Sequence, residues 1–337
     1  MDLPLTTRNA YDLVTLTPGI TYYSSSAQIG DTTGTEFSTN GIRPTLNSFY
    51  LDGAYNTEFF RGGGNVLPPP DALAEFRIIT SNFDAEFGRY PGAVVNAITR
   101  SGTNKFHGIA YDYLRNDALN ATNYFQNSKA MLRYNIYGAG FGGPILRQDL
   151  FFFANYQGLR INQQTIINQG SYTVPTTLER MGNFSASNTK PNVADCPNYV
   201  CPLDPVASAF ITNFVPNGVG GSSVGPEQRA SDPVRENQGT ARIDYQLNPA
   251  HHLEFTFFQS RGTSVNRTIN ANVLLNWTGL NVMANQSNYV IADNWIVSSH
   301  AVNTATVFYT LNQVSTTSMS SQYRRCPRQI QYGAQTS

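Results

Sequence analysis

The sequence has little charge. Asp, Glu, Lys and Arg make up 13% of its 337 residues, against about 25% in a typical globular domain. The chain is not strongly apolar either, since its mean hydropathy is -0.31. Its formal net charge is zero and it contains no basic run, so nothing in it resembles a nucleic-acid-binding patch. The composition therefore argues against an ordinary soluble enzyme and against a nucleic-acid-binding protein.

Long apolar runs and catalytic motifs are also missing. No stretch approaches the roughly 20 apolar residues of a membrane helix, so a chain of this kind would cross a membrane only as strands. Its 4 histidines form neither H-x-x-x-H nor H-E-x-x-H, and the glycines at 62–64 lack the Lys-Ser/Thr of a phosphate-binding loop. A G-x-S-x-G motif is absent as well. The sequence predicts no catalytic, cofactor-binding or metal site.

Cysteine is scarce, with 3 residues in the whole chain. Cys196 and Cys201 stand close together in a polar segment, and Cys326 lies near the end. The pair could close a small disulfide loop, form half of a metal site or remain as two thiols. Because no second cysteine pair or histidine cluster completes a zinc site, a disulfide in an oxidising compartment is the favoured interpretation.

Aromatic residues are plentiful, with 19 Tyr and 20 Phe but only 2 Trp, and so are Asn, Thr, Ser and Gln. A β-barrel that alternates an apolar outside with a wet inside has this balance. The chain changes character near residue 104. Before it, Gly, Pro, Thr and Asn join short elements, which predicts a small α+β domain.

Within that domain the sequence predicts a helix at residues 11–16 with Asn9 as its cap. A strand at 49–51 should lead into a turn at Asp52-Gly53. One helical turn is expected at 72–76 with Asp71 as N-cap. Two further strands are predicted at 77–80 and 93–99.

From residue 105 onward, longer strands are expected. In one of them Ala241, Ile243, Tyr245 and Leu247 form an apolar face, and the residues between them are polar. This period of two fits a sheet with one apolar and one polar face. The predicted strands are residues 105–116, 133–145, 150–163, 237–247, 252–263, 286–297 and 301–313.

The connections between these strands alternate strictly between short and long. An outer-membrane barrel has short periplasmic turns and long extracellular loops, so it predicts this alternation. A soluble β-sandwich with one large insertion is the alternative, but its strands would be shorter. The longest connection, 164–236, holds Cys196 and Cys201 and is expected outside the cell, where it either contacts a ligand or is a mobile loop without that role.

Several ordered motifs resemble the TonB-dependent outer-membrane receptors, most closely their Oar-like subgroup. The stretch DALAEFRIITSNFDAEFGRYPGAVVNAITRSGTNKFHG at 71–108 is similar to the end of the family's plug domain and the start of its barrel. The segments at 3–20 and 41–57 resemble earlier plug segments. The segments at 114–125, 141–145 and 149–160 resemble the first barrel hairpins.

The resemblance implies an α+β plug domain at 1–104, incomplete at its N-terminus. Antiparallel transmembrane strands of a partial β-barrel would follow at 105–319, and an irregular tail at 320–337. It singles out two sets of residues. The plug motif comprises Arg43, Asn47, Asp52, Gly53, Glu75, Glu86, Gly88 and Arg89, and the motif at the start of the barrel comprises Ser101, Gly102, Thr103, Asn104, His107 and Gly108. The residues expected to form ion pairs with the barrel lumen are Arg43, Glu75, Glu86, Arg89 and Arg100.

The resemblance also implies a function. Such a receptor lies in the outer membrane among its lipids, binds a bulky, scarce extracellular ligand and imports it with energy delivered by the protein TonB. TonB would act through an N-terminal box, and we expect that box, a signal peptide and the later barrel strands to lie outside this sequence. The alternatives are a structural or adhesive Oar-like protein of the envelope and a soluble β-rich binding module.

Overall fold

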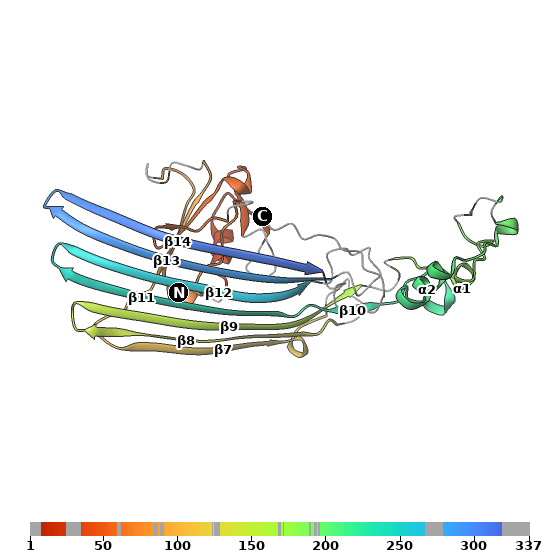
Figure 1. The fold of residues 1–337 in the computed structure, drawn as a ribbon. Coiled ribbons are helices and arrows are strands. Elements are labelled where there is room, and N and C mark those ends of the chain that lie inside the picture. The colour runs from red at the N-terminus through yellow and green to blue at the C-terminus, as the bar shows by residue number, and fades with distance from the viewer. Residues whose placement is uncertain are drawn as a thin grey trace.

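A computed structural model of the chain describes residues 8–24, 35–58, 62–83, 87, 91–122, 124, 129–167, 170, 172–188, 190–191, 194, 196–266 and 279–318. The model has an N-terminal domain of short elements and a sheet of long strands (Figure 1). Among the described residues, no helix has both the length and the apolar character needed to span a membrane.

The N-terminal domain is built on a small mixed sheet. A 3₁₀ helix at Ala10–Leu16 precedes a two-stranded sheet of β1 (Ile20–Ser24) and β2 (Glu36–Thr39). A 4-stranded sheet follows in the order β4-β3-β6-β5, in which β3 and β6 run parallel. Its strands are β3 (Ser48–Leu51), β4 (Ala54–Tyr55), β5 (Leu73–Ile79) and β6 (Val94–Thr99).

Most of the expected elements of this domain are present. The first helix is a 3₁₀ helix, and the side chain of Asn9 accepts a hydrogen bond from the backbone N–H of Tyr11, as an N-cap does. The helical turn predicted at 72–76 is wrong. A 3₁₀ turn ends at Ala72, and the chain then continues as β5, because its backbone pairs antiparallel with β6 from Leu73 to Ile79. The side chain of Asp71, expected to cap a helix, instead pairs with Arg8.

The core of the domain is aromatic. The ring of Phe49 meets those of Tyr11 and Phe37 edge to face, with ring centroids 5.7 Å apart in both pairs. All three side chains are at most 1% exposed. Phe258, which is 0% exposed, belongs to the same cluster although it comes from the long-stranded sheet. This one phenylalanine joins the apolar core of the domain to the sheet beside it.

The large sheet contains 8 strands, and its continuous path runs β14-β13-β12-β11-β9-β8-β7, with β10 beside β9. All pairs are antiparallel. The strands are β7 (His107–Asn116), β8 (Leu132–Leu146), β9 (Leu150–Ile167), β10 (Gln228–Ser231), β11 (Val234–Asn248), β12 (His251–Asn266), β13 (Leu280–Ser298) and β14 (Ala301–Ser318). Each long strand predicted from the sequence is present, and most extend a few residues further.

The short turns lie together at one end of this sheet (Figure 1). They connect β8 to β9, β11 to β12, and β13 to β14. The connection between β9 and β11 leaves from the opposite end, where α1 (Thr177–Arg180) and α2 (Pro205–Phe214) project beyond the strands. The region expected as one long loop thus contains two helices, and β10 pairs with the end of β9.

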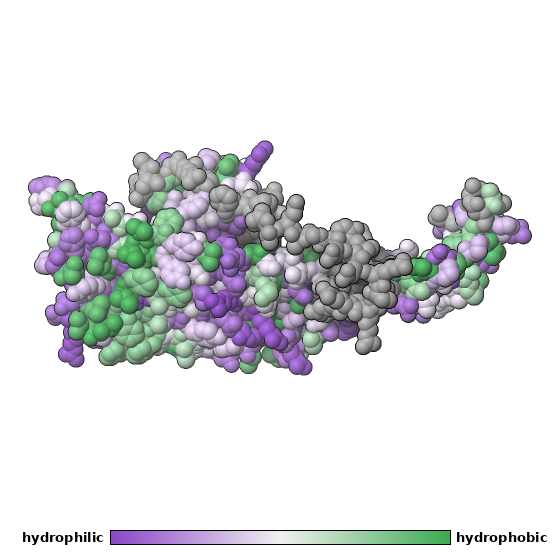
Figure 2. All heavy atoms as spheres, viewed as in Figure 1, coloured by the Kyte–Doolittle hydropathy of each residue, from purple (hydrophilic) through white to green (hydrophobic). Residues whose placement is uncertain are grey.

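Side chains alternate between the two faces of the sheet. Along β11, the even-numbered residues from Val234 to Asp244 are buried and, apart from Val234, polar, while the odd-numbered ones face away. We call the face toward the N-terminal domain the inward face and the other the outward face. In the half nearest the short turns, the outward face is apolar; Phe141, Ile243, Phe255 and Ile291 are all at least 37% exposed there. Figure 2 shows hydrophobic residues gathered over this half.

The inward position of Phe258 generates a prediction. We expect Phe258→Ala to weaken the attachment of the N-terminal domain by about 3–5 kcal/mol, because it removes a buried ring and leaves a cavity. The measurement is the urea concentration at which protease first cleaves the N-terminal domain. Phe257→Ala is the matched control, since the neighbouring side chain faces outward. Equal shifts in the two variants would contradict the role of Phe258.

Candidate functional site

The contacts between the N-terminal domain and the inward face centre on Arg242 of β11. Its guanidinium lies 2.8 Å from Asp244 Oδ1 and 2.8 Å from Glu254 Oε2. It also reaches the N-terminal domain, at 3.4 Å from Asp52 Oδ1 and 3.2 Å from the carbonyl oxygen of Thr99. The Arg242 side chain is only 8% exposed. One buried cation thus joins two carboxylates of the sheet to one of the domain, and we call these four side chains the charged cluster.

Asp52 is held in place by its turn. It has a φ of +48° and Gly53 one of +76°, the left-handed region that Asp and Gly adopt most readily. Its carboxylate accepts hydrogen bonds from the backbone N–H and the hydroxyl of Thr99, both at 2.8 Å. Burial raises the pKa of Asp52 above its ordinary value, and the hydrogen bonds from Thr99 and the charge of Arg242 only partly oppose this.

Next to the charged cluster, His252 extends the group of titratable side chains. Ligand atoms of Asp244, His252 and Glu254 lie within 4.8 Å of one another, as they would around a cation. Arg242 already donates to both carboxylates, however, and Ser101 donates to Asp244 Oδ2 at 2.7 Å. The group is therefore explained as part of the ion-pair network.

A second set of contacts between domain and sheet consists of neutral amides. Asn56 Oδ1 accepts hydrogen bonds from Gln286 at 3.1 Å and from Asn288 at 3.0 Å. Asn312 of β14 donates to Asn65 Oδ1 at 2.8 Å. We call these five side chains the amide cluster. They are partnered largely with one another, so the domain meets β13 and β14 without ion pairs at these positions.

A cavity separates the domain from the sheet on the side of β8 and β9. Its lining includes Arg8 and Tyr11 from the domain and Gln157 and Glu236 from the sheet. The Arg8 guanidinium lies over the rings of Tyr111 and Tyr113 of β7, 4.8 Å and 4.5 Å from their centroids. The lining also contains apolar side chains, among them Leu67, Ile136 and Leu159, so polar, aromatic and apolar groups surround a space that is not filled by side chains.

The motif at the start of the barrel lies where the domain passes into β7. Ser101 contacts Asp244, and Asn104 Oδ1 accepts a hydrogen bond from the backbone N–H of Gln148 in the first short turn, at 2.9 Å. A Cβ at Gly102 would come within 2.4 Å of the carbonyl oxygen of Phe152, so only glycine fits this close approach. Thr103 contacts the exposed His107, at 3.4 Å. Gly108 lies in β7, paired with Phe141.

The remaining plug-motif residues have different surroundings. Asn47 is 0% exposed; its amide donates to the carbonyl oxygen of Phe37 at 2.6 Å and accepts from the N–H of Ala93 at 2.8 Å. It holds three segments of the domain together. Arg43 and Glu75 are exposed.

The expected ion pairs involve different residues. Among the described residues, neither Arg43 nor Glu75 nor Arg100 is in an ion pair with the sheet, and the Arg100 side chain donates to the carbonyl oxygen of Leu73 instead. Glu86, Gly88 and Arg89 lie outside the described residues.

The sheet residues of these clusters were not singled out from the sequence. Arg242 and Asp244 were identified only as members of the polar face of their strand. Continuing that alternation to the next strands would have marked Gln286 and Asn288 as inward-facing, and Phe258 as an apolar exception. No pattern in the sequence indicates which groups of the domain they meet.

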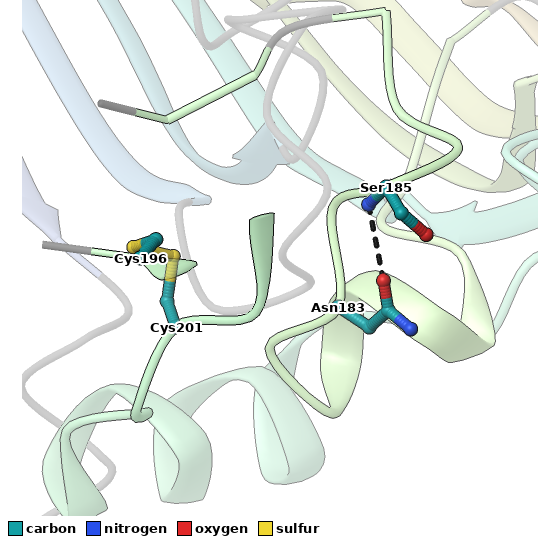
Figure 3. Close-up of a disulfide and its surroundings, with 4 residues drawn as sticks. All are labelled: Asn183, Ser185, Cys196 and Cys201. Atoms are coloured by element: carbon teal, nitrogen blue, oxygen red, sulfur yellow. Dashed lines mark hydrogen bonds between the residues drawn. A yellow bond between two sulfur atoms is a disulfide. The ribbon is translucent and has the colours of Figure 1, made fainter. Parts of the chain in front are cut away.

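The long connection contains the two cysteines. The structure joins Cys196 to Cys201 through a disulfide (Figure 3). Nearby, Asn183 Oδ1 accepts a hydrogen bond from the N–H of Ser185 at 3.0 Å. Arg180 of α1 donates to the carbonyl oxygens of Ile211 and Val215 at the end of α2, at 3.2 Å and 3.1 Å. The contacts of Arg180 thus join α1 to the end of α2.

The fold is similar to that of solved structures of a ferric enterobactin receptor. A mutant of the ferric enterobactin receptor PfeA from Pseudomonas aeruginosa superimposes with a TM-score of 0.53 and 16% identity, covering 91% of this chain and 38% of that one. A second PfeA mutant, in complex with enterobactin, gives 0.51 and 15%, covering 91% and 39%. At such identities the likeness concerns the fold. The fold is that of part of an outer-membrane receptor with its antiparallel barrel strands.

Residues 98–333 match the family described as outer membrane beta barrel domain, and the chain belongs to that family. The TonB-dependent transporter Oar of Myxococcus xanthus is 33% identical over 129 residues, which are 35% of this chain and 12% of that protein. The chain thus aligns with a small part of this relative. The resemblance to TonB-dependent receptors of the Oar-like subgroup and the location in the outer membrane are confirmed.

The raised pKa of Asp52 gives a pH prediction. A carboxyl group whose pKa is higher in the attached state stabilises that state most at low pH, and the contribution is lost as pH rises through the raised pKa. We therefore expect the wild-type domain to gain protease resistance relative to Asp52→Asn as pH falls from neutral towards the ordinary pKa of an aspartate, about 3.9. Asn tolerates the left-handed backbone at this position.

The measurement is the rate of proteolysis of the N-terminal domain in both proteins at each pH. Their difference isolates Asp52 from the other carboxylates, which titrate in both. Parallel pH curves would show that Asp52 does not titrate in this range.

Proposed function

We propose that the chain is part of a TonB-energised outer-membrane transporter, in which residues up to about 104 are the plug and the long strands are barrel wall. The observation that carries the proposal is the way the domain is attached. Its described contacts with the inward face include the charged cluster, the amide cluster, the hydrogen bond from Ser101 to Asp244, the stacking of Arg8 on β7 and the buried side chain of Phe258.

An attachment of this kind can be broken without unfolding either part. Polar groups that separate from one another can be hydrated by the water that enters between them, so the net free energy of each hydrogen bond is only about 0.5–1.5 kcal/mol. A large apolar interface would resist separation, because exposing apolar surface to water costs free energy. Force applied to the domain from the periplasmic side would therefore release it stepwise.

The extracellular side would capture the ligand. The end of the sheet opposite the short turns carries the disulfide-closed segment and the two helices. The solved structures that share the fold are named as a ferric enterobactin receptor, and the Myxococcus relative is named as a TonB-dependent transporter. We propose uptake of a scarce, bulky ligand through this end, with TonB as the partner.

Cysteine labelling in cells tests the proposal without knowledge of the ligand. In a complete receptor that contains this sequence and carries Cys326→Ser, Asn56→Cys places a thiol in the amide cluster, where Asn56 is 0% exposed. We expect maleimide to label it faster in energised cells that contain TonB than in cells without TonB or with a collapsed proton gradient. Movement of the plug would expose the thiol only in the first case.

Ser299→Cys is the matched control, because this residue lies in an exposed short turn and should be labelled equally under all conditions. If Asn56→Cys is labelled at the same rate with and without TonB, the domain is not moved. A structural or adhesive role in the envelope would then be the better description.

A further inference from the structure

Four arginines lie next to one another on the outward face of the sheet, on four neighbouring strands. Arg160 of β9 stands directly opposite Arg235 of β11. Arg261 lies two residues along β12 from the partner of Arg235, and Arg133 of β8 has the same diagonal relation to Arg160. Side chains at such positions are within reach of one another. We call this group the arginine cluster.

In the part of the chain that the structure describes, no carboxylate lies within ion-pair distance of the arginine cluster. Like charges directly opposite each other destabilise a sheet. Among the described residues, the ion pairs include none of these four arginines. Arg160 donates to the carbonyl oxygens of Leu159 and Glu236 at 2.8 Å and 2.6 Å and to Asn237 Oδ1 at 2.7 Å, which are all neutral acceptors. Its guanidinium also lies over the ring of Tyr137, 5.6 Å from the centroid. An arrangement with this unfavourable charge pattern points to an anion supplied from outside the chain.

The position of the arginine cluster along the strands indicates which kind of anion it binds. A row of aromatic side chains crosses the outward face in two groups on either side of β11. In the first group the ring centroids lie 6.4 Å apart, and in the second they lie 5.0 Å and 6.3 Å apart. The members of the row are Tyr137, Tyr156, Phe257, Tyr289 and Tyr309. Such rows mark the boundary between the apolar and polar layers of a membrane.

Three of the arginines lie four residues from a member of that row on the same strand, on the side away from the short turns. The pairs are Tyr137 and Arg133, Tyr156 and Arg160, and Phe257 and Arg261. Four residues of strand span about 13 Å, and strand tilt reduces this to about 10 Å along the membrane normal. The cluster is therefore at the level of lipid headgroups, and it faces sideways into them.

We propose that the arginine cluster binds the phosphate groups of a phosphorylated glycolipid in the outer leaflet of the outer membrane. Planar guanidinium groups match the oxygens of phosphate with two hydrogen bonds each. The proposal rests on the orientation given under the proposed function, with the short turns in the periplasm. A lipid phosphate would lie between Arg160 and Arg235 and remove their mutual repulsion.

Binding of lipid A to the full chain in neutral detergent tests this proposal. We expect the wild type to bind lipid A that carries both phosphates about tenfold more tightly than dephosphorylated lipid A. The double variant Arg235→Gln with Arg261→Gln should lose that preference. Arg147→Gln is the matched control, since Arg147 is exposed in a short turn at the opposite end, and its affinity should stay within about twofold of the wild type.

Thermal unfolding gives a second measurement, which does not require the variant to bind lipid A. In neutral detergent without lipid A, Arg235→Gln should unfold at the same or a higher temperature than the wild type, because it removes a like-charge pair. With phosphorylated lipid A present, the order should reverse. A variant that is less stable in both conditions would show a structural role for Arg235 and overturn the proposal.

Other outcomes overturn the proposal as well. Equal affinity of the wild type for the two forms of lipid A would show that phosphate is not recognised. Displacement of lipid A by equimolar inorganic phosphate would indicate a general anion site, and displacement by an acidic polypeptide would indicate a protein partner. Neither measurement involves TonB or transport, so their failure is distinguishable from failure of the labelling experiment.

Discussion

The alternation of side chains along the long strands is the constraint on which the rest of the structure depends. A shift of one residue in register would turn Arg242 and Asp244 toward lipid and Phe255 and Phe257 toward the domain. Such a shift would place a charged pair in an apolar layer, where each ion costs several kcal/mol. The irregularities at the ends of β8, β11 and β13 are confined to the short turns. Register is thus preserved along most of each strand.

This alternation gives the sheet two faces with different chemistry. The inward face presents carboxylates, amides and the guanidinium of Arg242 to the N-terminal domain, and one of its apolar side chains, that of Phe258, inserts into the core of that domain. Arg242 is the centre of this arrangement, because three carboxylates share it. Loss of such a cation would leave buried carboxylates unpaired, which usually costs about 3–5 kcal/mol. The attachment is therefore specific while remaining mostly polar.

The outward face changes along the strands. Near the short turns it is apolar and suited to the hydrocarbon layer. Beyond the row of aromatic side chains it becomes polar, and arginines replace the apolar residues. The strands extend past the apolar half of the face, and the connection between β9 and β11, with its disulfide and helices, projects beyond their end. The alternation between the two faces therefore continues along the whole strand, although the outward face is apolar in one half of the sheet and polar in the other.

Much of this architecture was predictable from local patterns. The long strands could be predicted, because in each one either the polarity of the side chains alternates or a polar turn marks the end of the strand, and both signals lie within a few residues. The cap at Asn9 and the turn at Asp52-Gly53 were predicted for the same reason. The helical turn at 72–76 was not correctly predicted, because pairing with β6 outweighs the local preference of that segment.

The sequence by itself determined the strands, their turns and the face on which each side chain lies, since these depend on a period of two and on turn chemistry. Only the tertiary structure decided what the inward side chains meet. Arg242 and Asp52 are separated by 190 residues, and Asn56 and Asn288 by 232. Contacts over such separations depend on how the domain is placed against the sheet, which no local pattern records.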